Sequence, residues 1–297
     1  MSQIFVSVII PTYNDWDCLA FCLDALSVQS YPAEAFEIIV VNNMPASTIP
    51  ENFKVPGNCL IIDEYKPGSY ASRNTGINIS KGEIIAFTDA DCIPDVNWLK
   101  NGVSYMQAHP EVGRIAGKIE LFYRSAKLVD VELYEKVYAF NQELYVKNDA
   151  TAVTANIFTY RSSFTLAGMF DEQLMSGGDY EWSVRAQKQG ITIHYLDTAV
   201  VKHPARYDIQ ELLKKAKRVG GGQAKFNGQT AQNQFKIFSR FLFDLRPPVK
   251  TIKLINDRGK DLNLAQKITV FRLRYYLSVV TAYEKFLVKK GKNASRA

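Results

Sequence analysis

Cysteine is scarce in this 297-residue chain, and its placement excludes two common uses. The 4 cysteines, Cys18, Cys22, Cys59 and Cys92, form neither a Cys-x-x-Cys pair nor a regular framework. A small disulfide-stapled fold would need such a framework, and a structural zinc site would need closely spaced ligand pairs. We therefore expect buried thiols in a reducing cytoplasm.

Long hydrophobic runs are also missing. No stretch of roughly 18 or more uncharged apolar residues occurs, which is the length that a membrane-spanning helix needs. The opening "MSQIFVSVIIPTYN" lacks the basic region and the small-residue cleavage site of a signal peptide. The composition, 47% hydrophobic and 22% charged, is that of an ordinary folded protein. These features predict a cytoplasmic chain.

Charge is distributed unevenly. Residues 1–204 carry 15 Lys and Arg against 24 Asp and Glu, a net charge of −9. Residues 205–297 carry 21 against 6, a net charge of +15, so the whole chain has +6. Such a basic C-terminal third either faces a polyanion or an anionic membrane surface, or is a solvated basic face. Charge alone leaves both alternatives open.

Short apolar runs alternate with helix-like stretches through residues 1–204. The runs are "FVSVII", "FEIIVV", "CLIID" and "GEIIAFTD". Continuous apolar strands separated by helices predict an α/β fold, a mostly parallel sheet flanked by helices. Several runs end in polar residues, namely Thr12 to Asp15, Asn42 and Asn43, and Asp89 to Asp91. Ligands of such sheets bind at the carboxyl ends of the strands, so we expect a binding site there.

The rest of the chain predicts mostly helix. We expect one helix over "KLVDVELYEKVYAFNQELY", short strands over "ITIHYL" and "TAVVKH", and a basic helix over "DIQELLKKAKRV" that runs into Gly220. Apolar residues three or four apart over 264–290 predict a long amphipathic helix. We divide the chain into residues 1–204, the α/β part, and residues 205–297, a basic, aromatic-rich helical extension that contacts a membrane or an oligomer partner.

Two carboxylates follow the fourth run, in "IIAFTDADCIPD". Residues i and i+2 of an extended chain point the same way, so Asp89 and Asp91 share a side if the strand persists to them. Two hard oxygen donors so placed suit Mg²⁺ or Mn²⁺, with open positions for phosphate oxygens. The alternative is a polar turn in which Asp95 caps the next helix. Asp-x-Asp alone does not decide between the two.

An ordered set of motifs favours the metal site. "VSVIIPTYN", "FEIIVVNN", "KPGSYASRNTGI", "GEIIAFTDAD", "TAN", "AGMFDE", "GGDYEW" and a terminal His occur in this order between Val6 and His203. Over these two thirds the chain resembles the inverting glycosyltransferases of family 2, of the bacterial non-processive type. The resemblance implies the GT-A (Rossmann-like) fold for residues 1–204, a nucleotide-sugar donor and a divalent cation. No Gln-x-x-Arg-Trp motif of the processive synthases follows, so we expect transfer of a single sugar.

The resemblance also implies a donor site. The residues implied to bind the nucleotide are Pro11, Thr12, Tyr13, Asn14, Asn42, Ser69, Arg73 and Asp89. An aromatic face and short polar side chains after the first strand would suit a pyrimidine, and the donor is expected to be a UDP-sugar. Asn42 stands where the family commonly has an acid that contacts the base, so here an amide would make that contact.

The metal and catalytic residues follow from the same resemblance. Asp89, Asp91 and His203 would hold the cation, Mg²⁺ or Mn²⁺. Asp179 would be the general base that deprotonates the acceptor hydroxyl, although the Glu that precedes it in the family is Gly178 here. The alternative for Asp179 is a helix N-terminal position stabilised by the dipole. The residues implied at the acceptor site are Asn156, Gly178, Glu181 and Trp182, the last offering a flat apolar face to a sugar.

We expect an enzyme of polysaccharide biosynthesis that acts on a saccharide or a polyprenyl-diphosphate-linked acceptor. We expect it to work in the cytoplasm; peripheral association with the inner face of the cytoplasmic membrane and a homo-oligomeric state are both left open. A catalytically weak nucleotide-sugar-binding scaffold is one alternative, because Asn42 and Gly178 replace acids. A nucleotidyltransferase is another, but it would need a Gly-rich basic loop in place of "PTYNDWD". The basic third contains no recognised nucleic-acid-binding motif, so no nucleic-acid partner is expected.

Overall fold

An eight-stranded mixed sheet forms the core of the first of two units into which the chain divides. The computed structural model describes residues 3–226 and 234–293. The first unit combines Met1–Glu120, Phe140–Gln173 and Gly178–Pro204, and the second combines Leu121–Ala139, Leu174–Gly177 and Ala205–Ala297. The division differs from a single boundary after residue 204, because two earlier segments pack with the C-terminal helices.

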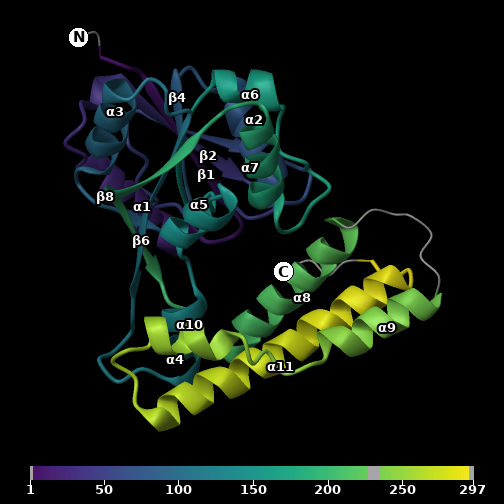
Figure 1. Ribbon diagram of the computed structural model, residues 1–297. Helices are drawn as coiled ribbons and strands as arrows, with labels where there is room; N and C mark the ends of the chain where they lie inside the picture. The colour runs from purple at the N-terminus through teal and green to yellow at the C-terminus, as the bar shows by residue number, and fades with distance from the viewer. Residues whose placement is uncertain (1–2, 227–233, 294–297) are drawn as a thin grey trace. The chain divides into compact units, whose positions relative to one another are not determined.

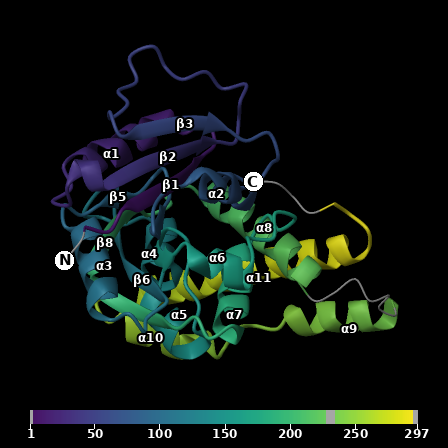
Figure 2. The same ribbon diagram turned by 90° about the horizontal axis from the view of Figure 1, so that it is seen from above.

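The parallel part of the sheet is built from the four apolar runs. The strands are β1 (Val6–Thr12), β2 (Phe36–Asn42), β3 (Cys59–Asp63), β4 (Ile84–Thr88), β5 (Ile93–Pro94), β6 (Arg114–Phe122), β7 (Asn156–Tyr160) and β8 (Ile193–Pro204). Their order is β3-β2-β1-β4-β7-β6-β8-β5, with β3 at the edge beside β2 and β1 in Figure 2. β3, β2, β1 and β4 run parallel, β7 is antiparallel to β4 and β6, and β5 is antiparallel to β8. The predicted α/β fold is confirmed.

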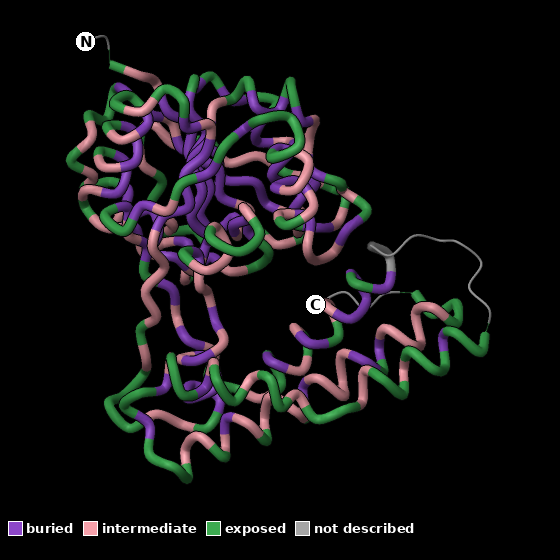
Figure 3. The backbone as a smooth tube through the Cα atoms, viewed as in Figure 1, coloured by how far each residue is buried: buried purple, intermediate pink, exposed green. Residues whose placement is uncertain are grey.

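Helices cover both faces of this sheet. They are α1 (Trp16–Ser27), α2 (Ser69–Ile79), α3 (Trp98–Ala108), α5 (Gln142–Asp149), α6 (Ser162–Ala167) and α7 (Gly178–Lys188), with a 3-10 helix, η1, at Ala33–Ala35. Side chains alternate between the two faces of a strand, so Val8 of β1 packs with α1 and α3 whereas Ile9 meets Gly76 of α2. Figure 1 shows α1 and α3 on one side of the strands and α2, α6 and α7 on the other. The strands between them form the buried core in Figure 3.

The chain between residues 127 and 204 departs from two expectations. The single helix expected over residues 127–145 is two helices, α4 (Asp130–Tyr138) and α5. Phe140 between them has φ 36°, in the left-handed region, and the Asn141 side chain caps α5 by accepting a hydrogen bond from the Leu144 backbone N–H at 3.1 Å. The two short strands expected over residues 191–196 and 198–203 form one 12-residue strand, β8.

The second unit is helical. Besides α4 it contains α8 (Ile209–Phe226), α9 (Gln234–Asp244), α10 (Thr251–Arg258) and α11 (Leu264–Lys289). One apolar cluster joins Tyr134 of α4 to Leu212 of α8 and Leu277 of α11, and another joins Val137 of α4 to Ile255 of α10. The long amphipathic helix expected over 264–290 is confirmed as α11.

Helix α8 runs through its glycines to Phe226 instead of stopping at them. A Cβ at Gly220 would lie 2.5 Å from the Thr281 carbonyl oxygen of α11. Glycine therefore lets the backbones of α8 and α11 approach closely, and this packing offsets the poor helix propensity of glycine.

Among the helices of residues 3–226 and 234–293, none combines the length and the apolar character that crossing a membrane requires.

Gly76→Ala should destabilise the protein although alanine favours helix formation. The added Cβ would lie 2.6 Å from Cγ2 of the fully buried Ile9, a β-branched side chain that cannot easily move aside. Overpacking costs about 1–3 kcal/mol, which exceeds the gain of about 1 kcal/mol from replacing a helical glycine. Urea unfolding should show a lower midpoint. Gly57→Ala is the matched control, since its Cβ would meet nothing within 4 Å, and an unchanged midpoint for Gly76→Ala would contradict the close packing of α2 on β1.

Candidate active site

Polar side chains form a row at the carboxyl ends of three parallel strands. Thr12 of β1 pairs in register with Asn42 of β2, which pairs with Asp63 of β3. The Asn42 amide donates to Asp63 Oδ1 at 2.9 Å and accepts from the Met44 backbone N–H at 3.0 Å. Asp63 was not among the expected site residues, yet it places a carboxylate beside the amide that replaces the family's acid. The sequence feature that could have identified Asp63 is its position at the end of the apolar run "CLIID".

The loop after β1 holds an exposed aromatic ring between fixed neighbours. The loop follows Pro11, the penultimate residue of β1. The side chain of Tyr13 is 63% exposed. Asn14 adopts the left-handed region with φ 53°, and its side chain accepts a hydrogen bond from the Ser47 hydroxyl at 2.6 Å. The loop is therefore held from the side while the Tyr13 ring remains open to stacking.

Arg73 and Asp89 form an ion pair that joins α2 to the end of β4. Arg73 is 3% exposed, and its Nη2 donates to Asp89 Oδ1 at 2.5 Å. Its Nη1 donates to the carbonyl oxygen of Ser69, the exposed first residue of α2. Arg73 Nε and Thr12 Oγ1 are buried and have no hydrogen-bond partner within the described residues. Unsatisfied buried polar atoms at this edge are consistent with a polar ligand.

Asp91 and His203 bring a carboxylate and an imidazole together. His203 Nε2 lies 3.4 Å from Asp91 Oδ2, and Nδ1 lies 2.7 Å from the Pro204 carbonyl oxygen. A carbonyl oxygen can only accept, so Nδ1 carries a hydrogen, and in the neutral imidazole Nε2 presents its lone pair to the carboxylate. Two acceptors that face each other fit a cation between them.

Cys92 lies beside this pair, with its Sγ 3.9 Å from Asp91 Oδ1. Burial, together with the Asp91 and Asp89 carboxylates, raises the pKa of the Cys92 thiol well above its usual value. A protonated thiol is a poor metal ligand, so Asp91 and His203 are the donors that suit Mg²⁺ or Mn²⁺ here.

Asp179 is a half-buried carboxylate on the first turn of α7. Its Oδ1 accepts hydrogen bonds from the Tyr180 backbone N–H at 2.9 Å and from the Tyr70 hydroxyl at 3.2 Å. Burial raises the pKa of Asp179, opposed by those hydrogen bonds and by the Arg73 charge, and the Asp89 carboxylate adds to the rise. A carboxylate whose pKa is raised toward neutrality is a stronger base.

Arg73 connects the two acidic positions. Its guanidinium pairs with Asp89 and lies 5.8 Å from the centre of the Tyr70 ring, and Tyr70 bonds to Asp179. The expected residues Arg73, Asp89 and Asp179 therefore share one electrostatic environment in the first unit. Such an arrangement can hold an anionic ligand at the sheet edge and keep a separate carboxylate ready to take a proton.

Two residues expected at the acceptor site lie in the core. Trp182 is fully buried, stacks on Phe164 at 4.8 Å between ring centres, and donates its indole N–H to the Gly168 carbonyl oxygen. Asn156 is also fully buried; it accepts from the Trp98 indole N–H and donates to the Lys118 and Ala199 carbonyl oxygens. Trp182 therefore does not offer the flat face to a sugar that the resemblance implied. The ring packs in an aromatic cluster because α7 turns it inward.

Glu181 and Gly178 shape α7 and its surroundings. The Glu181 carboxylate pairs with Arg185, which also donates to the carbonyl oxygens of Ala167 and Met169 and so anchors α7 to the preceding segment. A Cβ at Gly178 would lie 2.7 Å from the Tyr70 ring. Glycine at this position therefore lets Tyr70 approach the start of α7 and reach Asp179.

Known proteins resemble this chain in sequence and in fold. The family model described as glycosyl transferase family 2 matches residues 7–165. Glycosyltransferase AglE of Haloferax volcanii is 35% identical over 229 residues, 74% of this chain and 73% of that protein. A Methanococcus voltae protein, the dolichyl N-acetyl-alpha-D-glucosaminyl phosphate 3-beta-D-2,3-diacetamido-2,3-dideoxy-beta-D-glucuronosyltransferase, is 23% identical over 241 residues, 74% of this chain and 73% of that protein.

The fold also matches a solved structure. The mannosyltransferase PcManGT from Pyrobaculum calidifontis, in complex with GDP-Man and Mn²⁺, superposes with a TM-score of 0.52 at 18% identity, covering 99% of this chain and 77% of that chain. This likeness shows the fold, which is of the GT-A type expected from the resemblance. Because the family model covers more than half of the chain and a 35% identical relative covers most of it, the chain belongs to glycosyl transferase family 2.

Proposed function

We propose that this family 2 glycosyltransferase moves one hexose-type sugar, with inversion, from a nucleotide donor to a saccharide or lipid-linked acceptor. The observation that carries the proposal is the position of Asp179. Its carboxylate accepts from the Tyr70 hydroxyl and feels the charge of Arg73, which pairs with Asp89, and its raised pKa suits a base. Inverting transfer needs one such carboxylate, because the departing diphosphate requires no acid.

The donor would bind across the strand ends. The exposed Tyr13 ring offers a stacking face, and the Asn42–Asp63 pair offers an N–H donor beside a carboxylate acceptor. That pair complements the neighbouring O4 and N3–H of a uracil, which supports a UDP-sugar. Pro11, Thr12, Asn14 and Ser69 would line the same edge, with Arg73 close to the diphosphate.

The cation would be held by Asp91 and His203, with Asp89 reaching its water ligands. The facing acceptor atoms of Asp91 and His203 fit such an ion, and the Mn²⁺ in the PcManGT complex supports a divalent cation. When bound, it supplies positive charge against the departing diphosphate. Arg73 adds a fixed positive charge to the same end of the sheet.

Asp179 would take the proton from the acceptor hydroxyl as its oxygen attacks the anomeric carbon. The attack comes from the face opposite the diphosphate, the bond from the anomeric carbon to the diphosphate oxygen breaks, and its electron pair leaves with the diphosphate. Tyr70 holds the Asp179 carboxylate by its hydroxyl. Gly178 and Glu181 position α7 for this step, and the buried Trp182 and Asn156 stabilise the core around it.

The acceptor we propose is a saccharide or a polyprenyl-linked saccharide of a glycan pathway. The Methanococcus voltae relative, whose name specifies a dolichyl phosphate sugar acceptor, supports the lipid-linked alternative. A catalytically weak scaffold is the second candidate, favoured by the amide of Asn42 and by Gly178 in place of acids.

Asp179→Asn and Asp91→Asn should separate the two roles. Asp179→Asn removes the base, so sugar transfer should fall by a factor of about 100 or more, the range for general base catalysis, with donor affinity nearly unchanged. Asp91→Asn removes a ligand, so the gain in donor affinity on adding Mn²⁺ should shrink instead. Initial rates and calorimetric donor titrations, with and without Mn²⁺, measure both effects.

Asp171→Asn is the control for these variants, because Asp171 is an exposed acid outside the proposed site. Normal turnover of Asp179→Asn would show that another group is the base. Undiminished Mn²⁺ dependence in Asp91→Asn would exclude its ligand role. A wild-type protein that binds donor but transfers no sugar to any acceptor would favour the scaffold.

Asp179→Asn should also raise the stability of the folded protein at neutral pH. The fold raises the pKa of Asp179 above its ordinary value of 3.8, because burial disfavours the charged carboxylate. The stability that the protonated acid contributes is present below the unfolded-state pKa and is lost as the pH rises through the folded-state pKa. Urea unfolding from about pH 4 to pH 8 should show a growing advantage of Asp179→Asn over wild type. An advantage independent of pH would contradict a raised pKa.

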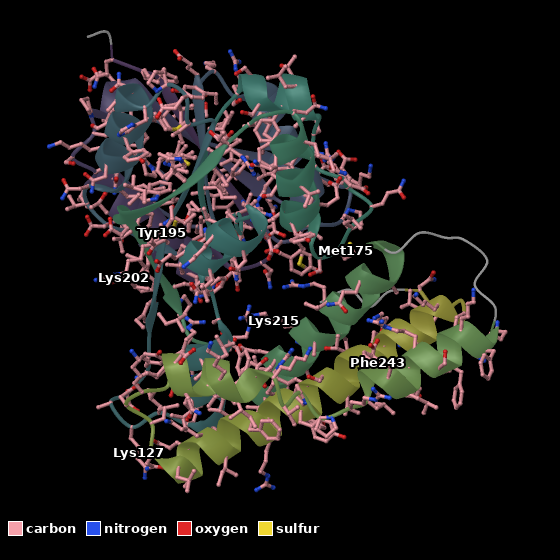
Figure 4. All side chains as sticks on the ribbon, in the orientation of Figure 1. Lys127, Met175, Tyr195, Lys202, Lys215 and Phe243 are labelled. Atoms are coloured by element: carbon pink, nitrogen blue, oxygen red, sulfur yellow. The ribbon has the colours of Figure 1, made fainter. Side chains whose placement is uncertain are left out.

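Membrane attachment is proposed for the helical unit. The α9 apolar face consists of Phe235, Phe238, Leu242 and Phe243, all about half exposed or more. The Arg240 and Arg246 guanidinium groups lie 5.1 and 4.7 Å from the centre of the Phe243 ring, which Figure 4 labels on α9. Exposed aromatics among cations are typical of helices at a lipid interface.

Phe238→Ser with Phe243→Ser should weaken binding to anionic vesicles, measured by co-sedimentation. Each nearby cation contributes about 1 kcal/mol through the surface potential, so binding of the wild type should fall as salt rises. Phe21→Ser, at an exposed position on α1, is the control and should bind normally. No binding at low salt would exclude the membrane, and a dimer lost in the double variant would assign the face to a second copy of the chain.

A further inference from the structure

A buried tyrosine of α2 reaches the first turn of α7 and donates a hydrogen bond to the proposed base. Tyr70 is 6% exposed, and its hydroxyl donates to Asp179 Oδ1 at 3.2 Å. The centre of its ring lies 5.7 Å from that of Phe170, which also packs on Trp182. The ring is therefore fixed by packing, and its hydroxyl reaches one oxygen of one carboxylate.

Gly178, the first residue of α7, allows this approach. A Cβ at residue 178 would lie 2.7, 2.8 and 2.9 Å from three atoms of the Tyr70 ring, closer than van der Waals contact permits. Any other side chain, including the glutamate that the family has here, would therefore push the buried ring away from Asp179. The hydroxyl of Tyr70 and the glycine at 178 belong to one arrangement, in which the tyrosine occupies space that a side chain at 178 would need.

The two oxygens of the Asp179 carboxylate have different surroundings. Oδ1 accepts from both the Tyr70 hydroxyl and the Tyr180 backbone N–H. In the part of the chain that the structure describes, Oδ2 accepts no hydrogen bond, and it is not one of the buried polar atoms that lack a partner, so it has access to solvent. One oxygen is thus held by the protein, and the other is open to a ligand.

The Tyr70 hydroxyl remains a hydrogen-bond donor at neutral pH. Burial and, after it, the Asp179 carboxylate raise the pKa of this hydroxyl well above its usual value, against the opposing charge of Arg73. A protonated hydroxyl that donates to a carboxylate favours the charged form of the acid. Tyr70 therefore holds Asp179 and also limits the rise in the pKa of Asp179 that burial causes.

We propose that Asp179 Oδ2 is the atom that takes the proton of the acceptor, and that Tyr70, which Gly178 allows to approach, is the positioning residue that holds the opposite oxygen. The inference rests on the proposed function, since it takes Asp179 as the base. The acceptor O–H bond breaks, its proton joins Oδ2, and its electron pair forms the bond to the anomeric carbon as the diphosphate leaves with its own pair. A carboxylate fixed through one oxygen keeps the other in one direction, and such alignment of reacting groups lowers the barrier to reaction.

Urea unfolding of the full chain tests the contact without any substrate. Tyr70→Phe keeps the ring and removes only the hydroxyl, so its loss of stability should be greatest at high pH, where Asp179 is charged, and smallest below the folded-state pKa of Asp179. In the Asp179→Asn background, the effect of Tyr70→Phe should not vary between about pH 4 and pH 8. Arg73 and Asp89, the other charged side chains that act on Asp179, are present in every variant.

Tyr160→Phe is the matched control for this measurement. Its hydroxyl also donates over 3.2 Å, but to the Met106 carbonyl oxygen, an acceptor that does not titrate. The loss of stability in Tyr160→Phe should therefore be the same at each pH, with Asp179 or with Asn at position 179.

The pH profile of turnover tests the consequence for the base. The reaction is release of UDP from UDP-glucose or UDP-N-acetylglucosamine with Mn²⁺, in which water is the acceptor. In Tyr70→Phe the acidic limb of kcat should move to higher pH, because the carboxylate has lost a hydrogen bond that favours its charged form. Above this limb kcat should still be about tenfold below wild type, with the donor KM within about twofold, because Oδ2 is no longer held in one direction.

Gly178→Ala provides a second route to the same state. Its Cβ would displace the Tyr70 ring, so it should reproduce both kinetic changes and add little to them in the Tyr70→Phe background. Tyr160→Phe should keep the wild-type pH profile.

The two measurements separate the possible failures. A loss of stability in Tyr70→Phe that is equal at all pH values would overturn the inference and leave the proposed function standing. A pH-dependent loss of stability, together with a wild-type pH profile and wild-type kcat in Tyr70→Phe, would show that Asp179 is held as described but is not the base, which would overturn both.

Discussion

The ion pair between Arg73 and Asp89 joins α2 to the end of β4, and the arrangement of the candidate site depends on it. Arg73 is almost completely buried, so loss of Asp89 would leave a buried cation uncompensated, which is far more costly than loss of a surface pair. The same guanidinium acts on Asp179 and lies against Tyr70. One buried cation thereby sets the electrostatic environment of two carboxylates that come from distant parts of the chain.

Different surroundings give the acids of this site different tasks. Asp91 faces the imidazole of His203 and is about one-third exposed, an arrangement that suits coordination. Asp179 is held by a tyrosine hydroxyl and a backbone N–H in packed surroundings that raise its pKa, which suits proton transfer. Carboxylates in such different surroundings commonly divide the roles of charge stabilisation and base.

The helical unit shows why net charge alone was ambiguous. Its positive charge has at least two distinct settings: cations around the buried Glu135, and guanidinium groups stacked on the exposed Phe243. The first cations surround a buried carboxylate, and the second lie against an exposed ring. A count of Lys and Arg over residues 205–297 cannot distinguish the two, because burial decides what each charge does.

Local sequence by itself determined the parallel half of the sheet, the polar residues at its carboxyl ends and the long helix α11, because strand and helix periodicities are short-range properties. The ordered motifs also indicated the family. Tertiary structure alone decided that Asp63 stands beside Asn42, that Trp182 and Asn156 lie in the core, and that α8 continues through Gly220 against α11. Each of these depends on which face of an element meets another element, and the hydrogen-bond partner lies 21 residues away in the chain for Asn42 and 14 residues away for Trp182.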